Sequence, residues 1–117
     1  MNTHVGRCQC GKVRYEAEID LEKAVIDCNC SICSKQGLML TFIPAESFTL
    51  ISGEGNLTEH KFNKERIRHY FCKTCGVESF GKGNGPNGNA MVAINVRTLD
   101  NIELSKLIVM PFDGKSL

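Results

Sequence analysis

The sequence has no tryptophan, no excess of charge of either sign and no long apolar run. Its 14 basic and 13 acidic residues leave a net charge of +1. This balance, with no basic tract, argues against an electrostatic surface for nucleic acids or membranes, so neither partner is expected. No segment approaches transmembrane length, and residues 1–4 lead into no apolar stretch of a signal peptide. We therefore expect a cytoplasmic protein.

Internal repeats, linkers and a sustained helical period are also missing. A chain of 117 residues is long enough for a hydrophobic core, and we expect one domain over residues 1–117. Only 7% of the residues are aromatic, so few large rings are available to hold that core together.

Cysteine, in contrast, is abundant: the chain has seven, and all of them stand in clusters. The clusters are the triplet Cys28, Cys30 and Cys33, the pair Cys8 and Cys10, and the pair Cys72 and Cys75. Thiols of a cytosolic chain stay reduced, so clustered cysteines indicate metal ligands rather than disulfides. Zinc is the usual ion of such sites. The odd number of cysteines agrees with this interpretation.

The count predicts two kinds of site. A closed structural zinc site takes four protein ligands, whereas a catalytic site takes three and leaves one position open. The two pairs would form the closed site, and the triplet would form the open one. We therefore expect two zinc ions per chain, the three-ligand ion being held less tightly and lost first. The closed site would contribute on the order of 10 kcal/mol to folding, because it joins distant segments.

Several alternatives stay open from the residues alone. Cys72 and Cys75 could pair with two cysteines of the triplet. The triplet could hold a second, purely structural zinc with water as fourth ligand, or it could be a redox-sensing group of thiols. The three histidines are expected to be surface or hydrogen-bonded strand residues, although one could supply a fourth ligand: His4, His60 and His69.

The apolar pattern predicts a mostly β protein. Val13, Tyr15, Ala17 and Ile19 alternate with charged residues, which is typical of a half-buried strand. The further strands that we predict are 24–28, 38–43, 48–51, 57–62, 67–71, 77–82 and 91–96. Turn formers indicate a hairpin-like turn at Gly53 and Gly55, a polar turn over 63–66 and a loop over 83–89 that could form a lid. The region 99–117 gives no clear pattern.

Four segments of the chain resemble the motifs of a known family, the glutathione-dependent formaldehyde-activating family, which also includes centromere protein V. These are residues 6–15 (GRCQCGKVRY), 28–37 (CNCSICSKQG), 71–76 (FCKTCG) and 95–100 (NVRTLD). The resemblance implies a small two-sheet antiparallel β-sandwich with zinc knuckles. It also implies a structural zinc held by the two cysteine pairs and a second zinc held by the triplet, in agreement with the count. The sequence departs from the family at Asn29, where histidine is usual, and at Ser34, which precedes Lys35 where arginine is common.

The resemblance further implies a zinc-dependent enzyme of the carbon–sulfur lyase type, similar to S-(hydroxymethyl)glutathione synthase. Such an enzyme condenses glutathione, or a similar thiol, with a small aldehyde such as formaldehyde, the thiol entering as fourth ligand of the open zinc. Zinc with three thiolates is already negative, so a further anionic sulfur needs a cation or hydrogen-bond donors nearby. Lys35 is the nearest candidate in sequence for binding substrate, and Lys73 and Arg97 qualify only if the fold brings them close. The competing hypothesis is a non-enzymatic zinc module that acts as a structural or binding partner. The oligomeric state stays open.

Overall fold

The structure is a computed structural model that describes residues 2–62 and 67–116. Within these residues the chain forms ten strands, one short α-helix and several 3₁₀ turns. The strands are β1 (Asn2–Arg7), β2 (Arg14–Ile19), β3 (Val25–Cys28), β4 (Leu40–Pro44), β5 (Phe48–Ser52), β6 (Leu57–Phe62), β7 (Ile67–Cys72), β8 (Glu78–Asn84), β9 (Ala90–Asn95) and β10 (Val109–Phe112). The helix is α1 (Ser31–Gln36), and the 3₁₀ turns are η1 (Ala45–Ser47), η2 (Glu54–Asn56), η3 (Val96–Thr98), η4 (Leu104–Lys106) and η5 (Gly114–Ser116).

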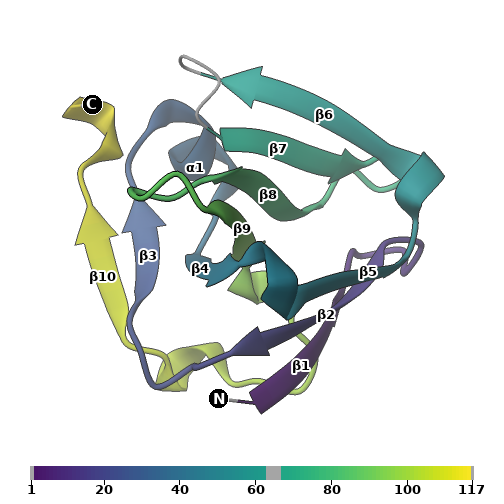
Figure 1. Cartoon of the computed structure of the whole chain (residues 1–117), viewed down its shortest axis with the longest axis horizontal. Coiled ribbons are helices and arrows are strands. Elements are labelled where there is room, and N and C mark those ends of the chain that lie inside the picture. Colours follow the sequence, from purple (N-terminus) through teal and green to yellow (C-terminus); the bar gives the residue numbers. More distant parts are fainter. Residues whose placement is uncertain (1, 63–66, 117) are drawn as a thin grey trace.

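The strands form two sheets, which confirms the predicted mostly β, two-sheet class (Figure 1). The smaller sheet has the order β1-β2-β5, and the larger has the order β10-β3-β4-β9-β8-β7-β6. The described pairings are antiparallel except for that of β10 with β3, which is parallel. The sequence did not predict this pair, because β10 lies in the region that gave no pattern.

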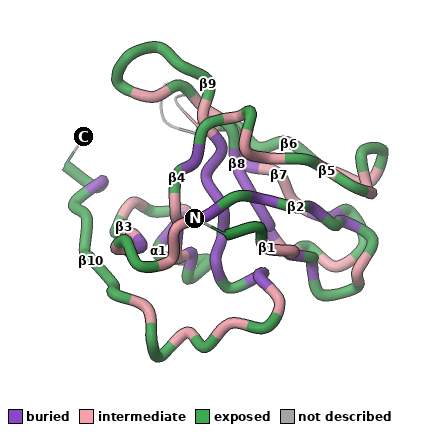
Figure 2. The backbone as a smooth tube through the Cα atoms, turned by 60° about the horizontal axis from the view of Figure 1, so that its bottom comes forward, coloured by how far each residue is buried: buried purple, intermediate pink, exposed green. Residues whose placement is uncertain are grey.

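The hydrophobic core lies between the sheets and contains the alternating residues of β2. Tyr15, Ala17 and Ile19 are buried there, while the charged residues between them are exposed. The Tyr15 ring lies 5.6 Å from that of Phe48 and 6.5 Å from that of Phe80, measured between ring centroids. The few aromatic residues are thus concentrated at the contact between the sheets, where each buries a large apolar area. Figure 2 shows the buried stretches on β2, β8 and β9, with β10 exposed at the rim.

Close packing against Tyr15 explains the glycine at position 6. Gly6 lies opposite Tyr15 in the pairing of β1 with β2, and a Cβ at this position would collide with the tyrosine ring. The Tyr15 hydroxyl lies 2.7 Å from Thr98 Oγ1. This buried contact links β2 to the turn after β9, so the smaller sheet is attached to the larger one by packing and by a hydrogen bond.

The predicted strands agree with the structure to within a few residues, but two turns do not. The hairpin-like turn predicted at Gly53 and Gly55 is wrong, because β5 and β6 belong to different sheets and η2 carries the chain between them. The loop predicted over 83–89 is shorter, since β8 continues to Asn84. The polar turn predicted over 63–66 lies outside the described residues.

None of the helices in the described ranges is long and apolar enough to cross a lipid bilayer.

Candidate metal centres

The structure brings the two cysteine pairs together at one point, here called the four-thiol group: Cys8, Cys10, Cys72 and Cys75. Their sulfur atoms all lie within 4.8 Å of one another, and the thiols are free. Cys8 and Cys10 lie between β1 and β2 of the smaller sheet, whereas Cys72 ends β7 of the larger sheet. A metal ion held by all four sulfurs would therefore join the two sheets.

The two pairs lie on turns of the same construction. In the first, the Cys8 N–H donates to the Val13 carbonyl at 3.0 Å, and the Gly11 N–H donates to the Cys8 carbonyl at 3.2 Å. In the second, the Cys72 N–H donates to the carbonyl of Val77, and the Gly76 N–H donates to that of Cys72. Gly11 and Gly76 have φ values of 82° and 79°, which glycine adopts without strain.

Backbone and side-chain donors surround the sulfurs of the four-thiol group. Burial raises the pKa of the Cys75 thiol, but the backbone N–H groups of Val77 and Cys10 outweigh it and lower that pKa to about 6. The Asn56 side-chain amide donates to Cys72 Sγ at 3.3 Å, a contact that no sequence pattern predicted. These donors favour the thiolate form of Cys72 and Cys75, the form that binds metal ions. At Cys10 the Lys12 N–H is outweighed by burial and by hydrogen bonds with the other three thiols, which raise the pKa to about 11.

The remaining cysteines form the three-thiol group: Cys28, Cys30 and Cys33. Their sulfur atoms also lie within 4.8 Å of one another. Cys28 ends β3, Cys30 immediately precedes α1, and Cys33 is a buried residue of α1. Because α1 begins between Cys30 and Cys33, these two sulfurs lie on neighbouring positions of its first turn and converge with that of Cys28.

The pKa shifts within the three-thiol group have opposite directions. Burial raises the pKa of Cys28 and, more strongly, that of Cys33. For Cys30, burial acts in the same sense, but hydrogen bonds from the backbone N–H groups of Cys33 and Ile32 and from the two neighbouring thiols together outweigh it, and the pKa lies below its ordinary value. The Cys30 sulfur is thus the most readily deprotonated of the three.

The C-terminal segment, defined here as residues 112–116, covers one side of the three-thiol group. Asn29 holds it with three hydrogen bonds: its N–H donates to the Phe112 carbonyl, its amide nitrogen donates to Asp113 Oδ1 at 2.9 Å, and its amide oxygen accepts from the Lys115 N–H at 2.8 Å. A Cβ at Gly114 would lie less than 3.0 Å from Cys28 Sγ. Sequence reasoning missed these contacts, because they join residues far apart in the chain.

A pocket of about 450 Å³ opens beside the three-thiol group and is called here the thiol pocket. Its lining comprises Asp27, Cys28, Asn29, Cys33, Ser34, Gly37, Pro111, Phe112 and Asp113. Among the described His, Cys, Asp and Glu residues, no fourth one joins the three thiols as a potential ligand. The pocket therefore leaves room for an exogenous molecule next to the three sulfurs.

The other predicted site residues lie outside both groups. Lys35, Lys73 and Arg97 are exposed, and none of them lines the thiol pocket. The role predicted for Lys35 in substrate binding stays a prediction. His69 is a buried strand residue whose Nδ1 lies 2.7 Å from Glu78 Oε2, as expected for a satisfied core histidine.

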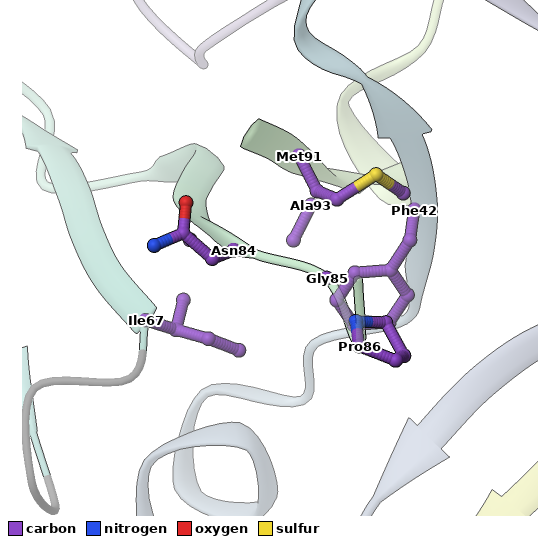
Figure 3. Close-up of a pocket in the computed structure, with 8 residues that line it drawn as sticks. Phe42, Ile67, Asn84, Gly85, Pro86, Met91 and Ala93 are labelled. Atoms are coloured by element: carbon purple, nitrogen blue, oxygen red, sulfur yellow. The ribbon is translucent and has the colours of Figure 1, made fainter. Parts of the chain in front are cut away.

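A smaller, mainly apolar pocket of about 200 Å³ lies on the surface of the larger sheet. Figure 3 shows Phe42, Met91 and Ala93 on one side of it and Ile67 and Asn84 on the other. The Gly85–Pro86 end of the predicted loop lines this pocket, whereas the lining of the thiol pocket includes no residue of 83–89. The interpretation of this loop as a lid over the three cysteines is therefore wrong.

Both groups fit a zinc ion by their donor atoms and spacing. All donors are cysteine sulfurs, which zinc prefers in structural sites. A tetrahedral ion with Zn–S bonds of about 2.3 Å places its sulfurs about 3.8 Å apart. The Cys10 sulfur lies 3.6 Å from that of Cys8 and 3.6 Å from that of Cys72. Little movement would be needed to hold an ion.

Comparison with known proteins bears on the family and on the fold. A family model described as "Glutathione-dependent formaldehyde-activating enzyme" matches residues 3–110. A crystal structure of a Rhodobacter sphaeroides protein is similar in fold, with a TM-score of 0.77 and 24% sequence identity. That match covers 90% of this chain and 97% of the other. The matched residues 3–110 include all seven cysteines.

Proposed function

The chain belongs to the glutathione-dependent formaldehyde-activating enzyme family, and from this membership we propose that it is a zinc-dependent enzyme of the carbon–sulfur lyase type. Its reaction would join a thiol, glutathione or a similar one, to a small aldehyde, or cleave the resulting adduct. The three-thiol group with its adjoining pocket would be the active site. The four-thiol group would hold a structural zinc, so that one cytoplasmic domain of residues 1–117 carries two ions.

The observation that carries this proposal is the combination of three converging thiols with a pocket and no fourth protein ligand among the described residues. A catalytic zinc site has this composition, since its fourth position serves water or substrate. The pocket favours the enzyme hypothesis, because a substrate needs space beside the zinc. A non-enzymatic zinc module needs no such space, and a closed surface beside the three thiols would be enough for it.

The residues of the site would have distinct roles in the reaction. A zinc ion bound there would lower the pKa of an incoming thiol and so supply a thiolate at neutral pH. Cys28, Cys30 and Cys33 would hold the ion, and Asn29 would hold the C-terminal segment that forms one wall of the pocket. When the thiolate adds to the aldehyde carbon, a C–S bond forms, the C=O double bond becomes a C–O single bond, and the thiol proton ends on that oxygen. The reaction therefore needs no oxidant or reductant.

X-ray absorption at the zinc edge tests the proposal directly. With saturating glutathione or mercaptoethanol, the zinc of the three-thiol group should gain a sulfur neighbour at about 2.3 Å. Cys30→Ser should abolish the gain, because it removes one of the three thiols that would hold the ion. An unchanged spectrum with both thiols, or closure of the fourth position by a protein nitrogen or carboxylate, would remove the ground for calling this protein an enzyme.

A further inference from the structure

The charged residues that line the thiol pocket are all acidic. They are Asp27, next to Cys28 in β3, and Asp113, in the C-terminal segment. Among the described residues that line the pocket, none is a lysine, arginine or histidine. The Asp113 carboxylate accepts hydrogen bonds from the Ser116 hydroxyl at 2.7 Å and from the Asn29 amide at 2.9 Å, which favour its charged form. A molecule entering the pocket therefore meets two carboxylates and no cationic side chain of the described lining.

This charge distribution does not suit an anionic thiol. Glutathione carries more carboxylates than amino groups and is negative at neutral pH. Its carboxylates would normally be recognised by arginine or lysine in a site built for them. We infer that the thiol pocket selects thiols that carry a positively charged amino group over anionic thiols, so that the substrate class is an aminothiol or its aldehyde adduct. This inference rests on the proposed function and concerns the same site.

Two lysines near the site carry the opposite charge and would favour an anionic thiol. Lys35 lies in the last turn of α1, two residues after Cys33, and Lys115 follows Gly114 in the C-terminal segment. Both are exposed, and neither lines the pocket. The two aspartates line the pocket and the lysines do not, so a bound molecule lies nearer to the aspartates, whose charges should dominate.

Affinities of three thiols of similar size and different charge measure this preference. Cysteamine carries an amino group, mercaptoethanol is neutral and mercaptoacetate carries a carboxylate. Each would be titrated into the zinc-loaded protein by calorimetry, with glutathione as a fourth probe. Because the three thiols differ in their own acidity, the informative quantity is the change that a variant causes in the affinity for each thiol, which cancels that difference.

The variants remove single charges. Asp27→Asn keeps the size of the side chain and removes its charge, and Asp27 is exposed, so folding should not suffer. Glu46→Gln is the matched control, since it removes the same charge from η1, outside the lining of the pocket. Lys35→Met tests the competing possibility that a cation on α1 recognises an anionic substrate. Mercaptoethanol serves in every variant as the reference that reports any damage to the metal site.

We expect the ratio of cysteamine to mercaptoacetate affinity to fall by about three- to tenfold in Asp27→Asn. Mercaptoethanol affinity should change by less than about twofold, and glutathione affinity should rise in the same variant. Glu46→Gln should leave all four affinities unchanged.

Two results would overturn the inference while leaving the proposed function in place. One is an unchanged cysteamine to mercaptoacetate ratio in Asp27→Asn. The other is a selective loss of mercaptoacetate and glutathione binding in Lys35→Met, which would show that the site recognises anions. If none of the four thiols binds to the zinc-loaded wild-type protein, the proposed function itself is wrong, and the inference is wrong with it.

Discussion

Replacing Gly114 by alanine tests whether the C-terminal segment and the three-thiol group form one unit. The new Cβ would lie less than 3.0 Å from Cys28 Sγ and 3.5 Å from Cys30 Cβ. Ordinary van der Waals contact begins near 3.4 Å, so the segment or the sulfur has to move by at least about 0.4 Å. Metal-ligand distances in proteins hold to about 0.2 Å, so a movement of this size is enough to disturb a ligand.

We expect the three-thiol group of Gly114→Ala to bind zinc about ten- to a hundredfold more weakly, the range found when partners of metal ligands are disturbed. Overpacking should also lower the free energy of unfolding by about 1–3 kcal/mol. The four-thiol group should keep its ion, because the atoms nearest to the new Cβ belong to Cys28, Cys30 and Phe112 and not to that group. A competition titration with a chromophoric chelator would resolve the two equivalents of zinc.

Two further variants separate steric pressure from other effects of a glycine-to-alanine change. Gly55→Ala is the matched control, since a Cβ there meets nothing within 4 Å, and neither glycine has a positive φ. Adding Asn29→Ala to Gly114→Ala frees the segment and should restore part of the affinity. If Gly114→Ala binds the second ion as tightly as Gly55→Ala does, the close contact between the segment and Cys28 is refuted.

The remaining predictions concern the metal sites and the core. Cys72→Ser should unfold the protein, because it opens a site worth on the order of 10 kcal/mol, whereas Cys30→Ser should keep the fold and lose thiol binding; equal thermal unfolding of both variants would contradict this division. When the pH is lowered, protons should displace the ion of the three-thiol group first, because three thiolates hold it there against four in the other group; the metal retained after filtration at successive pH values measures the order, and simultaneous release would speak against it. His69→Ala should lower the free energy of unfolding in urea by about 3 kcal/mol, because it leaves the buried Glu78 carboxyl without its partner at 2.7 Å, and a change below about 1 kcal/mol would show that water replaces the ring.

Sequence patterns predicted those parts of the fold that depend on local periodicity. The alternation from Val13 to Ile19 gave β2 because one face of this strand is buried throughout, and the apolar run before Pro44 gave β4. The cysteine clusters were also evident from spacing alone. The structure brings the cysteines together in one group of four and one group of three, as their number predicted. The resemblance to the family added the expected function, which spacing alone does not contain.

The parts that were missed have no local signal. Helix α1 has six residues, too few for a helical period to appear, and its turn is shaped by the cysteines that it carries. Every residue of β10 is exposed, so this strand shows no alternation of buried and exposed positions. The contacts of Asn29 with Asp113 and Lys115 span more than 80 residues of sequence. Only the completed fold brings such residues together.

The separation of the cysteines along the chain sets an order of assembly during synthesis. The three-thiol group is complete once residue 33 has left the ribosome, whereas the four-thiol group has to wait for Cys75. β10 and the C-terminal segment, which cover one side of the three thiols, emerge later than both cysteine pairs. A nascent chain therefore presents the three thiols to cellular zinc before the four-thiol group exists, and the two groups can compete for an ion only after Cys75 has emerged.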